Sequence, residues 1–180
     1  IWVIVSLIAY IYISHQSLKK IFAYSAYAYW FVVVLLILVL IPGFSQEIQG
    51  ARRWLNIGLF SLQPSEFIKG VLVIYLPYLI HTKKILPQQF LYLGFIPVGL
   101  ILIQPDLGTA IVVSSLVIGL YLLSSYKLKD LIKYLPLGLI FITIYISSSS
   151  YRMDRIKSFL STNSYQSHQS LIAIGQGGIF

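Results

Sequence analysis

The chain has 180 residues, of which 58% are hydrophobic and 10% are charged, and its mean hydropathy is +0.84. This composition indicates an integral membrane protein, because a chain so apolar needs lipid as its solvent. The sequence contains no cysteine, which excludes disulfides, thiolate metal sites and a cysteine nucleophile. Its formal charge of +8 comes from small basic clusters between apolar runs, a distribution typical of membrane topology signals and not of nucleic-acid binding.

Six apolar runs can cross about 30 Å of hydrocarbon as helices, at about 1.5 Å per residue. Helix is the expected conformation, because the runs show no alternation and lipid tolerates no open sheet edge. The runs are Ile1–Leu18, Ile21–Pro42, Gly70–His81 with a lead-in from Ser65, Ile85–Pro105, Leu107–Tyr126 and Tyr134–Tyr151. The sequence therefore predicts an all-α, polytopic transmembrane bundle that forms a single domain over residues 1–180.

Loops between the predicted spans alternate sides, so the lysines can assign the two faces. Short loops on one face carry Lys19, Lys20, Lys83, Lys84, Lys127, Lys129 and Lys133. The positive-inside tendency makes that face cytoplasmic. The outer face then receives a loop at about 43–63, the turn around Asp106 and a tail at about 152–170. Because successive loops lie on opposite sides, the motifs that fall in the outer loops share one predicted surface. These motifs are GARRW, QPSEFIK, QPDLG and YRMDR.

One aspartate, Asp106, interrupts the apolar stretch LILIQPDLGTAIVV, residues 100–113. A carboxylate costs about 2.5–3.5 kcal/mol at the centre of a membrane helix, so its predicted place at an outer boundary removes most of that cost. One interpretation is an N-cap that accepts backbone N–H bonds from the next helix. The other is a general base or a cation ligand. Both roles are compatible in one residue.

The motif QPSEFIK, residues 63–69, puts two opposite charges at the predicted start of a helix. Glu66 could merely complement the helix dipole behind Pro64, with Ser65 as a cap. However, Lys69 lies three residues further on, so the two charges share one helix face. Ionisable residues in a span usually face a polar cavity or a partner. We therefore favour a pair that lines a cavity.

Two adjacent arginines, Arg52 and Arg53, precede Trp54 in GARRW. They are either interfacial anchors in the aromatic belt or a phosphate clamp. A guanidinium can grip a phosphate, such as that of a lipid-linked pyrophosphate, through two hydrogen bonds. The residues alone do not choose between these roles. The histidines have no partner at metal-ligand spacing, so they predict no metal site.

Four motifs in order, GARRW with the following LNIG, QPSEFIK, QPDLGT and YQSHQSLIAIGQGG, resemble the SEDS family, the polytopic bacterial membrane proteins FtsW, RodA and SpoVE. The match runs along nearly the whole sequence. The family chain is larger, about twice this length with further spans, and this chain resembles its middle half. The stretch YRMDRIKSFL looks more like FtsW or SpoVE than RodA.

The resemblance implies a glycosyltransferase that polymerises lipid II into glycan strands at the outer face of the bacterial plasma membrane, in cell division or cell shape. Its implied partner is a class B penicillin-binding protein. The sugar 4-hydroxyl of one lipid-linked disaccharide attacks the anomeric carbon of another, and polyprenyl pyrophosphate leaves. Such a reaction requires a base and a pyrophosphate clamp.

Carried over by motif, Asp106 is the catalytic candidate of this sequence. The substrate-binding candidates are Arg52, Arg53, Glu66, Lys69 and Arg155. The sequence assigns no cofactor, and a divalent cation at the Asp106 carboxylate stays open. The family's other aspartate belongs to a motif past the glycine-rich turn, so these 180 residues alone are expected to be inactive. Between Leu160 and Tyr165 the sequence lacks the Asp-Pro and glycine common in the family, which predicts a shorter outer loop.

Two other functions are compatible with the resemblance. The first is a flippase that moves lipid II between leaflets, and the second is a membrane scaffold that recruits a penicillin-binding protein. A flippase requires polar groups along the crossing path, whereas Glu66, Lys69 and Asp106 gather at one predicted end. A scaffold requires no charge pair in a span. The sequence therefore favours the enzyme.

Overall fold

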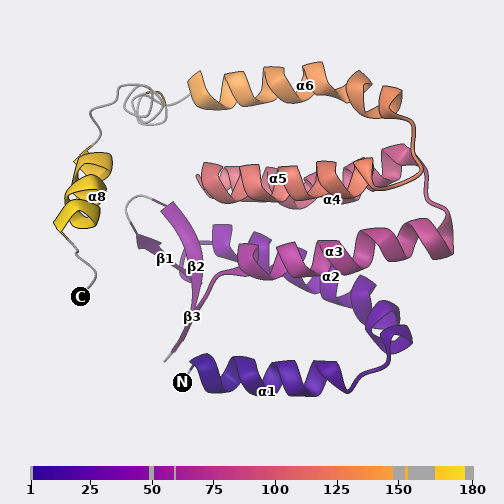
Figure 1. The fold of residues 1–180 in the computed structure, drawn as a ribbon, viewed down its shortest axis with the longest axis horizontal. Coiled ribbons are helices and arrows are strands. Elements are labelled where there is room, and N and C mark those ends of the chain that lie inside the picture. The colour runs from indigo at the N-terminus through magenta and orange to yellow at the C-terminus, as the bar shows by residue number, and fades with distance from the viewer. Residues whose placement is uncertain (1, 49–50, 59, 148–152, 154–164, 177–180) are drawn as a thin grey trace. The chain divides into compact units, whose positions relative to one another are not determined.

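The computed structural model describes residues 2–48, 51–58, 60–147, 153 and 165–176 (Figure 1). Helices dominate these residues, as the sequence predicts. The chain divides into two compact units, Ile1–Lys127 and Leu128–Phe180. Each unit is described by itself.

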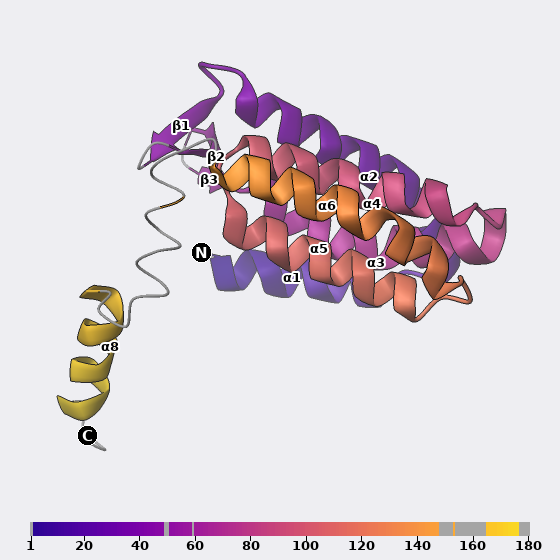
Figure 2. The same cartoon turned by 90° about the horizontal axis from the view of Figure 1, so that it is seen from above.

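The first unit is a set of packed helices with a small sheet. Its helices are α1 (Trp2–Ser14), α2 (Leu18–Leu40), α3 (Pro64–Lys83), α4 (Pro87–Ile103) and α5 (Leu107–Leu122). Helix α3 packs against α2, α4 and α5, and α4 also packs against α2 and α5. Both views show α2 to α5 side by side, with the sheet at one end of them (Figure 1, Figure 2).

The core of this unit lies between α2, α3, α4 and α5. Its fully buried side chains include Leu36, Ile68, Leu72, Leu76, Ile101, Val113 and Val117. Tyr29 is also buried, because its ring stacks on Tyr75 and its hydroxyl donates to the carbonyl of Leu93 at 2.7 Å. The outward side chains are apolar as well, among them Phe31 in α2 and Ile111 in α5. Helices that are hydrophobic all round are typical of membrane spans.

One described helix has the length and the composition of a membrane span. Among the described helices, α2 is long and apolar enough to cross a membrane, and it has 23 residues. Helices α4 and α5 are apolar but shorter, with 17 and 16 residues. All six predicted runs contain helix, but the predicted count of six spans is not confirmed. Helices α4 and α5 are shorter than the predicted runs Ile85–Pro105 and Leu107–Tyr126, because those runs included turn residues such as Pro105 and Tyr126.

The prediction of an all-α chain was wrong for residues 43–63, which were expected to form a loop. They contain a three-stranded antiparallel sheet in the order β1-β2-β3. Its strands are β1 (Ser45–Ile48), β2 (Ala51–Ile57) and β3 (Phe60–Leu62). Gly58, with φ of +67°, stands at the turn between β2 and β3, a conformation that glycine adopts without strain. Lipid forbids open strand edges only within the hydrocarbon, so the rule that predicts helix does not constrain a segment that was predicted to be a loop outside it.

The second unit contains α6 (Leu128–Ser147) and α8 (Tyr165–Gln176). Helix α6 begins before the predicted run at Tyr134 and takes Lys129 and Lys133 into its first two turns. The predicted outer tail at about 152–170 is helical from Tyr165 onward. Most of that tail, including the predicted short loop, lies outside the described residues.

A close contact between α4 and α5 gives the first testable prediction. A Cβ atom on Gly94 would overlap with the methyl groups of Val117. We expect Gly94→Ala to lower the free energy of unfolding by about 1–3 kcal/mol, because two packed helices must separate to admit one methyl group. The measurement is denaturant or thermal unfolding of the purified protein in detergent.

The matched control is Gly99→Ala in the same helix. A Cβ atom there meets nothing within 4 Å. Alanine is a better helix former than glycine by about 1 kcal/mol, so this variant is expected to be neutral or slightly more stable. Equal stability of the two variants would show that α4 and α5 do not approach this closely.

Candidate functional site

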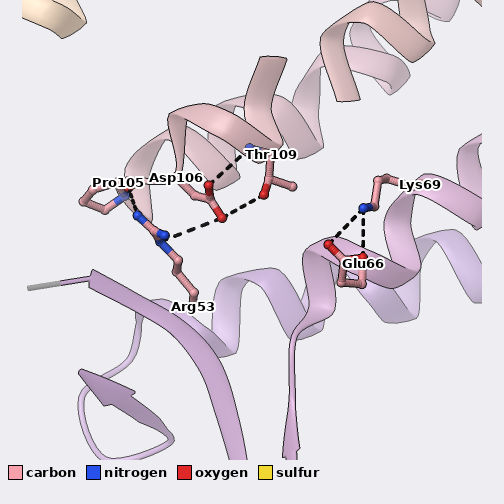
Figure 3. Close-up of polar contacts among 6 residues, drawn as sticks. All are labelled: Arg53, Glu66, Lys69, Pro105, Asp106 and Thr109. Carbon is pink, nitrogen blue, oxygen red and sulfur yellow. Dashed lines mark hydrogen bonds and ion pairs between the residues drawn. The ribbon is translucent and has the colours of Figure 1, made fainter. Parts of the chain in front are cut away.

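Asp106 stands at the turn between α4 and α5 and is the N-cap of α5. Its Oδ1 accepts a hydrogen bond from the backbone N–H of Thr109 at 3.2 Å, and its Oδ2 accepts one from the Thr109 hydroxyl at 2.9 Å (Figure 3). The residue is only 7% exposed. The capping interpretation is therefore confirmed. The catalytic role remains a prediction.

The turn that carries Asp106 is fixed by its neighbour Gln104. This residue is the C-cap of α4 and is 1% exposed. Its side-chain Nε2 donates to the carbonyl of Leu36 in α2 at 2.9 Å. A buried amide needs such a partner to offset the loss of water. The bond ties the position of Asp106 to α2 as well as to α4 and α5.

Arg53 reaches the same turn from β2, as Figure 3 shows. Its Nη2 donates to the carbonyl of Pro105, and its Nε lies 3.8 Å from Asp106 Oδ2. The Arg53 side chain is 31% exposed and that of Asp106 is 10% exposed. The Nε group is buried and has no hydrogen bond among the described residues. The contact with Asp106 is therefore electrostatic attraction without a hydrogen bond.

The two arginines of GARRW have different places in the sheet. The register of β1 and β2 shifts between Gln46, which lies opposite Trp54, and Glu47, so Arg53 falls at an irregularity of the ladder. The strand register pairs Arg52 with Glu47 of β1. Of the two, Arg53 is the arginine that faces Asp106. Substrate binding by either remains a prediction.

Glu66 and Lys69 form the ion pair that their spacing predicts. Lys69 Nζ donates to both carboxylate oxygens of Glu66, at 2.9 and 2.8 Å (Figure 3). The Lys69 side chain is 29% exposed and the Glu66 side chain is 55% exposed, so the ion pair is only partly buried. The suggested cap by Ser65 was wrong, because Gln63 occupies the N-cap position and Pro64 opens the helix. Ser65 is already inside the first turn.

The structure thus brings the predicted residues together as two pairs on neighbouring elements. Helix α3, which carries Glu66 and Lys69, packs against α5, which Asp106 begins. Among the described contacts, no ion pair links the two pairs. Arg155 lies outside the described residues. Within the part of the chain that is described, no three acidic or histidine side chains gather as a metal site, and the divalent cation remains an untested prediction.

Two neighbours of Asp106 were missed in the sequence. Thr109 stands three residues after the cap, at the position where capping boxes place a second polar side chain, and this spacing could have revealed it. Gln104 could not be found in this way. Its partner is a main-chain carbonyl in α2, far away in the sequence, and no local spacing predicts such a contact.

The fold and the site define a class: a helical protein with membrane-like apolar faces and a buried acidic cap at one end of its helices. The family model FtsW/RodA/SpoVE, described as "Cell cycle protein", matches residues 1–180. The chain therefore belongs to this family, and the predicted SEDS resemblance is confirmed.

Curated relatives carry the name "Probable peptidoglycan glycosyltransferase FtsW". The one from Nitrosomonas europaea is 33% identical over 169 residues, which are 86% of this chain and 43% of the relative. The one from Coxiella burnetii is 35% identical over 171 residues, which are 87% of this chain and 46% of the relative. The chain spans less than half the length of these relatives. Their names agree with the predicted lean towards FtsW or SpoVE.

Solved structures share the fold. A chain from "Structural coordination of polymerization and crosslinking by a peptidoglycan synthase complex" gives a TM-score of 0.74 at 29% identity, over 96% of this chain and 55% of that one. The rod shape determining protein RodA of Thermus thermophilus gives a TM-score of 0.63 at 29% identity, over 74% of this chain and 46% of that one.

The Glu66–Lys69 pair gives the second prediction. We expect Glu66→Gln and Lys69→Met to be non-additive in the free energy of unfolding, with a coupling of about 0.2–1 kcal/mol, because the pair is only partly buried. A double-mutant cycle in detergent measures this coupling. As a control, Glu66→Gln combined with Lys83→Met at the other end of α3 should be additive. Additivity in both cycles would mean that each charge of the pair has a separate partner.

Proposed function

We propose that this chain is part of a peptidoglycan glycosyltransferase that polymerises lipid II into glycan strands, in cell division or cell shape. The observation that carries the proposal is a buried carboxylate, Asp106, held beside the guanidinium of Arg53 at one end of the helices in a member of this family. The names of its relatives support the reaction class.

The proposed reaction assigns one role to each member of this pair. A base must remove a proton from the attacking sugar hydroxyl, and the Asp106 carboxylate is an acceptor held in a fixed position. Negative charge must be stabilised on the departing pyrophosphate. Arg53 uses one nitrogen for the Pro105 carbonyl, while a guanidinium offers five N–H donors. Its remaining donors suit a phosphate oxygen.

The proposed location is the bacterial inner membrane, with several spans and with the site at the outer face. The contact of Arg53 with Pro105 brings the segment after α2 and the turn between α4 and α5 to the same end of the first unit. Lys20, near the start of α2, and Lys83, at the end of α3, belong to the opposite ends of these helices. By the positive-inside tendency, the end that carries these lysines is the proposed cytoplasmic end. The end that carries Arg53 and Asp106 is then the proposed outer end.

The proposed partner is a class B penicillin-binding protein, and the proposed substrate is lipid II held within membrane lipid. One structural neighbour comes from a study of a peptidoglycan synthase complex, which supports the partner. Polymerisation is favoured over a flippase because the described ion pairs lie in the first turns of α3 and at the start of α5. A crossing path would require polar groups further along the helices.

The third prediction tests Asp106 in the full-length protein. Asparagine keeps the ability to cap but loses the charge. We expect Asp106→Asn to be expressed and folded normally, while lipid II polymerisation with the partner falls by about a hundredfold or more. Asp106→Ala should also lose about 0.5–2 kcal/mol of stability through the lost cap. Near-normal polymerisation by the asparagine variant would reduce Asp106 to a structural residue.

The fourth prediction concerns sidedness. Reporter tags inserted after Lys84 and after Lys129 are expected to lie in the cytoplasm, because these positions belong to the lysine-rich loops. Tags near Gln49 or Thr162 are expected outside the cell. Labelling of each tag in intact and permeabilised cells measures the side. Reversed reporters would place Asp106 inside, where the proposed polymerisation cannot occur.

A further inference from the structure

We propose that Thr109 is a positioning residue that sets the orientation of the Asp106 carboxylate, and that its hydroxyl serves the reaction and not the helix cap. The inference rests on the proposed function of Asp106. It starts from the observation that Thr109 donates two separate hydrogen bonds to this one carboxylate, one to each oxygen (Figure 3).

The two oxygens of Asp106 have different surroundings. Oδ1 accepts from the Thr109 backbone N–H, and this bond alone satisfies an otherwise unpaired donor of the first helical turn. Oδ2 accepts from the Thr109 hydroxyl and faces Arg53 Nε. The cap therefore depends on Oδ1, while Oδ2 is the oxygen next to the charged group proposed to meet the substrate.

The second bond is what fixes the plane of the carboxylate. The χ2 torsion of aspartate is broad, so a single bond to Oδ1 leaves Oδ2 free to swing. Arg53 cannot hold it, because 3.8 Å without a hydrogen bond gives attraction but little direction. The Thr109 hydroxyl, at 2.9 Å, is the one described group that gives Oδ2 a defined direction.

Three other serine and threonine hydroxyls in the described helices make a different contact. Ser25, Ser115 and Thr82 each donate to a backbone carbonyl three or four residues earlier. Such a bond is the usual arrangement for serine and threonine in helices and serves the side chain itself. Thr109 is three residues after its acceptor too, but that acceptor is a carboxylate oxygen. At the start of α5 the threonine hydroxyl therefore donates to the Asp106 carboxylate and not to a backbone carbonyl.

Orientation matters to a base, because it must lie within about 2.6–3.2 Å of the proton that it accepts. A misplacement of about 1 Å can cost about a hundredfold in rate. If the Thr109 hydroxyl orients Oδ2, its removal slows the chemical step without weakening substrate binding. If the hydroxyl only supports the helix, its removal affects unfolding instead.

The experiment compares variants of the full-length protein in lipid II polymerisation with its partner, measuring kcat, KM and thermal unfolding. Thr109→Val has nearly the same shape and keeps the backbone N–H that caps the helix. We expect its kcat to fall about tenfold to a hundredfold, with KM and unfolding unchanged. Thr109→Ser keeps a hydroxyl at this position, so its kcat should lie close to that of the unchanged protein. Thr82→Val is the matched control, because it removes a threonine hydroxyl that donates to the Tyr78 carbonyl, and it should leave all three quantities unchanged.

Asp106→Asn, measured beside these variants, separates the inference from the proposed function. An inactive asparagine variant together with a fully active Thr109→Val would overturn the positioning role and leave the role of Asp106 intact. An active asparagine variant would overturn the role of Asp106 and the inference with it. A lower unfolding temperature of Thr109→Val, with a rate loss no larger than that of equally destabilised variants, would make the hydroxyl merely structural.

Discussion

The arrangement of the first unit depends on a buried polar turn between two apolar helices. Gln104 and Asp106 are 1% and 7% exposed. Buried polar groups are costly unless they find partners. Gln104 finds its partner in α2, and Asp106 finds its partner in the first turn of α5. The Gln104 side chain thus joins the end of α4 to α2, and the Asp106 side chain caps the start of α5 directly after it.

Polar and close contacts carry special weight for helices in lipid. Lipid tails are as apolar as leucine, so burial of apolar surface gives little preference for one helix arrangement over another. The described helices instead meet through specific contacts. Tyr29 in α2 donates to a carbonyl in α4, and Gly94 in α4 allows Val117 of α5 to approach closely. These contacts hold the helices on which the candidate site is built.

The same turn links the fold to the proposed chemistry. Arg53 holds the sheet against the turn through the Pro105 carbonyl, yet it makes no hydrogen bond to Asp106. An anionic ligand that binds this guanidinium therefore does not have to break a hydrogen bond to the carboxylate. The pair combines a carboxylate held by hydrogen bonds with a guanidinium that is partly exposed, an arrangement that suits the proposed stabilisation of a phosphate beside a base.

The sequence by itself determined the features that depend on near neighbours in the chain. Apolar runs and their breaks located the helices, spacing of three residues paired Glu66 with Lys69, and Asp106 could be read as a cap because it precedes its helix. Motif order also determined the family. Only the tertiary structure decided that strands β1, β2 and β3 form within residues 43–63, that Arg53 forms the ion pair with Asp106, and that Gln104 binds α2. These features depend on distances between segments far apart in the chain, and such distances are set by packing and strand register, which no local pattern encodes.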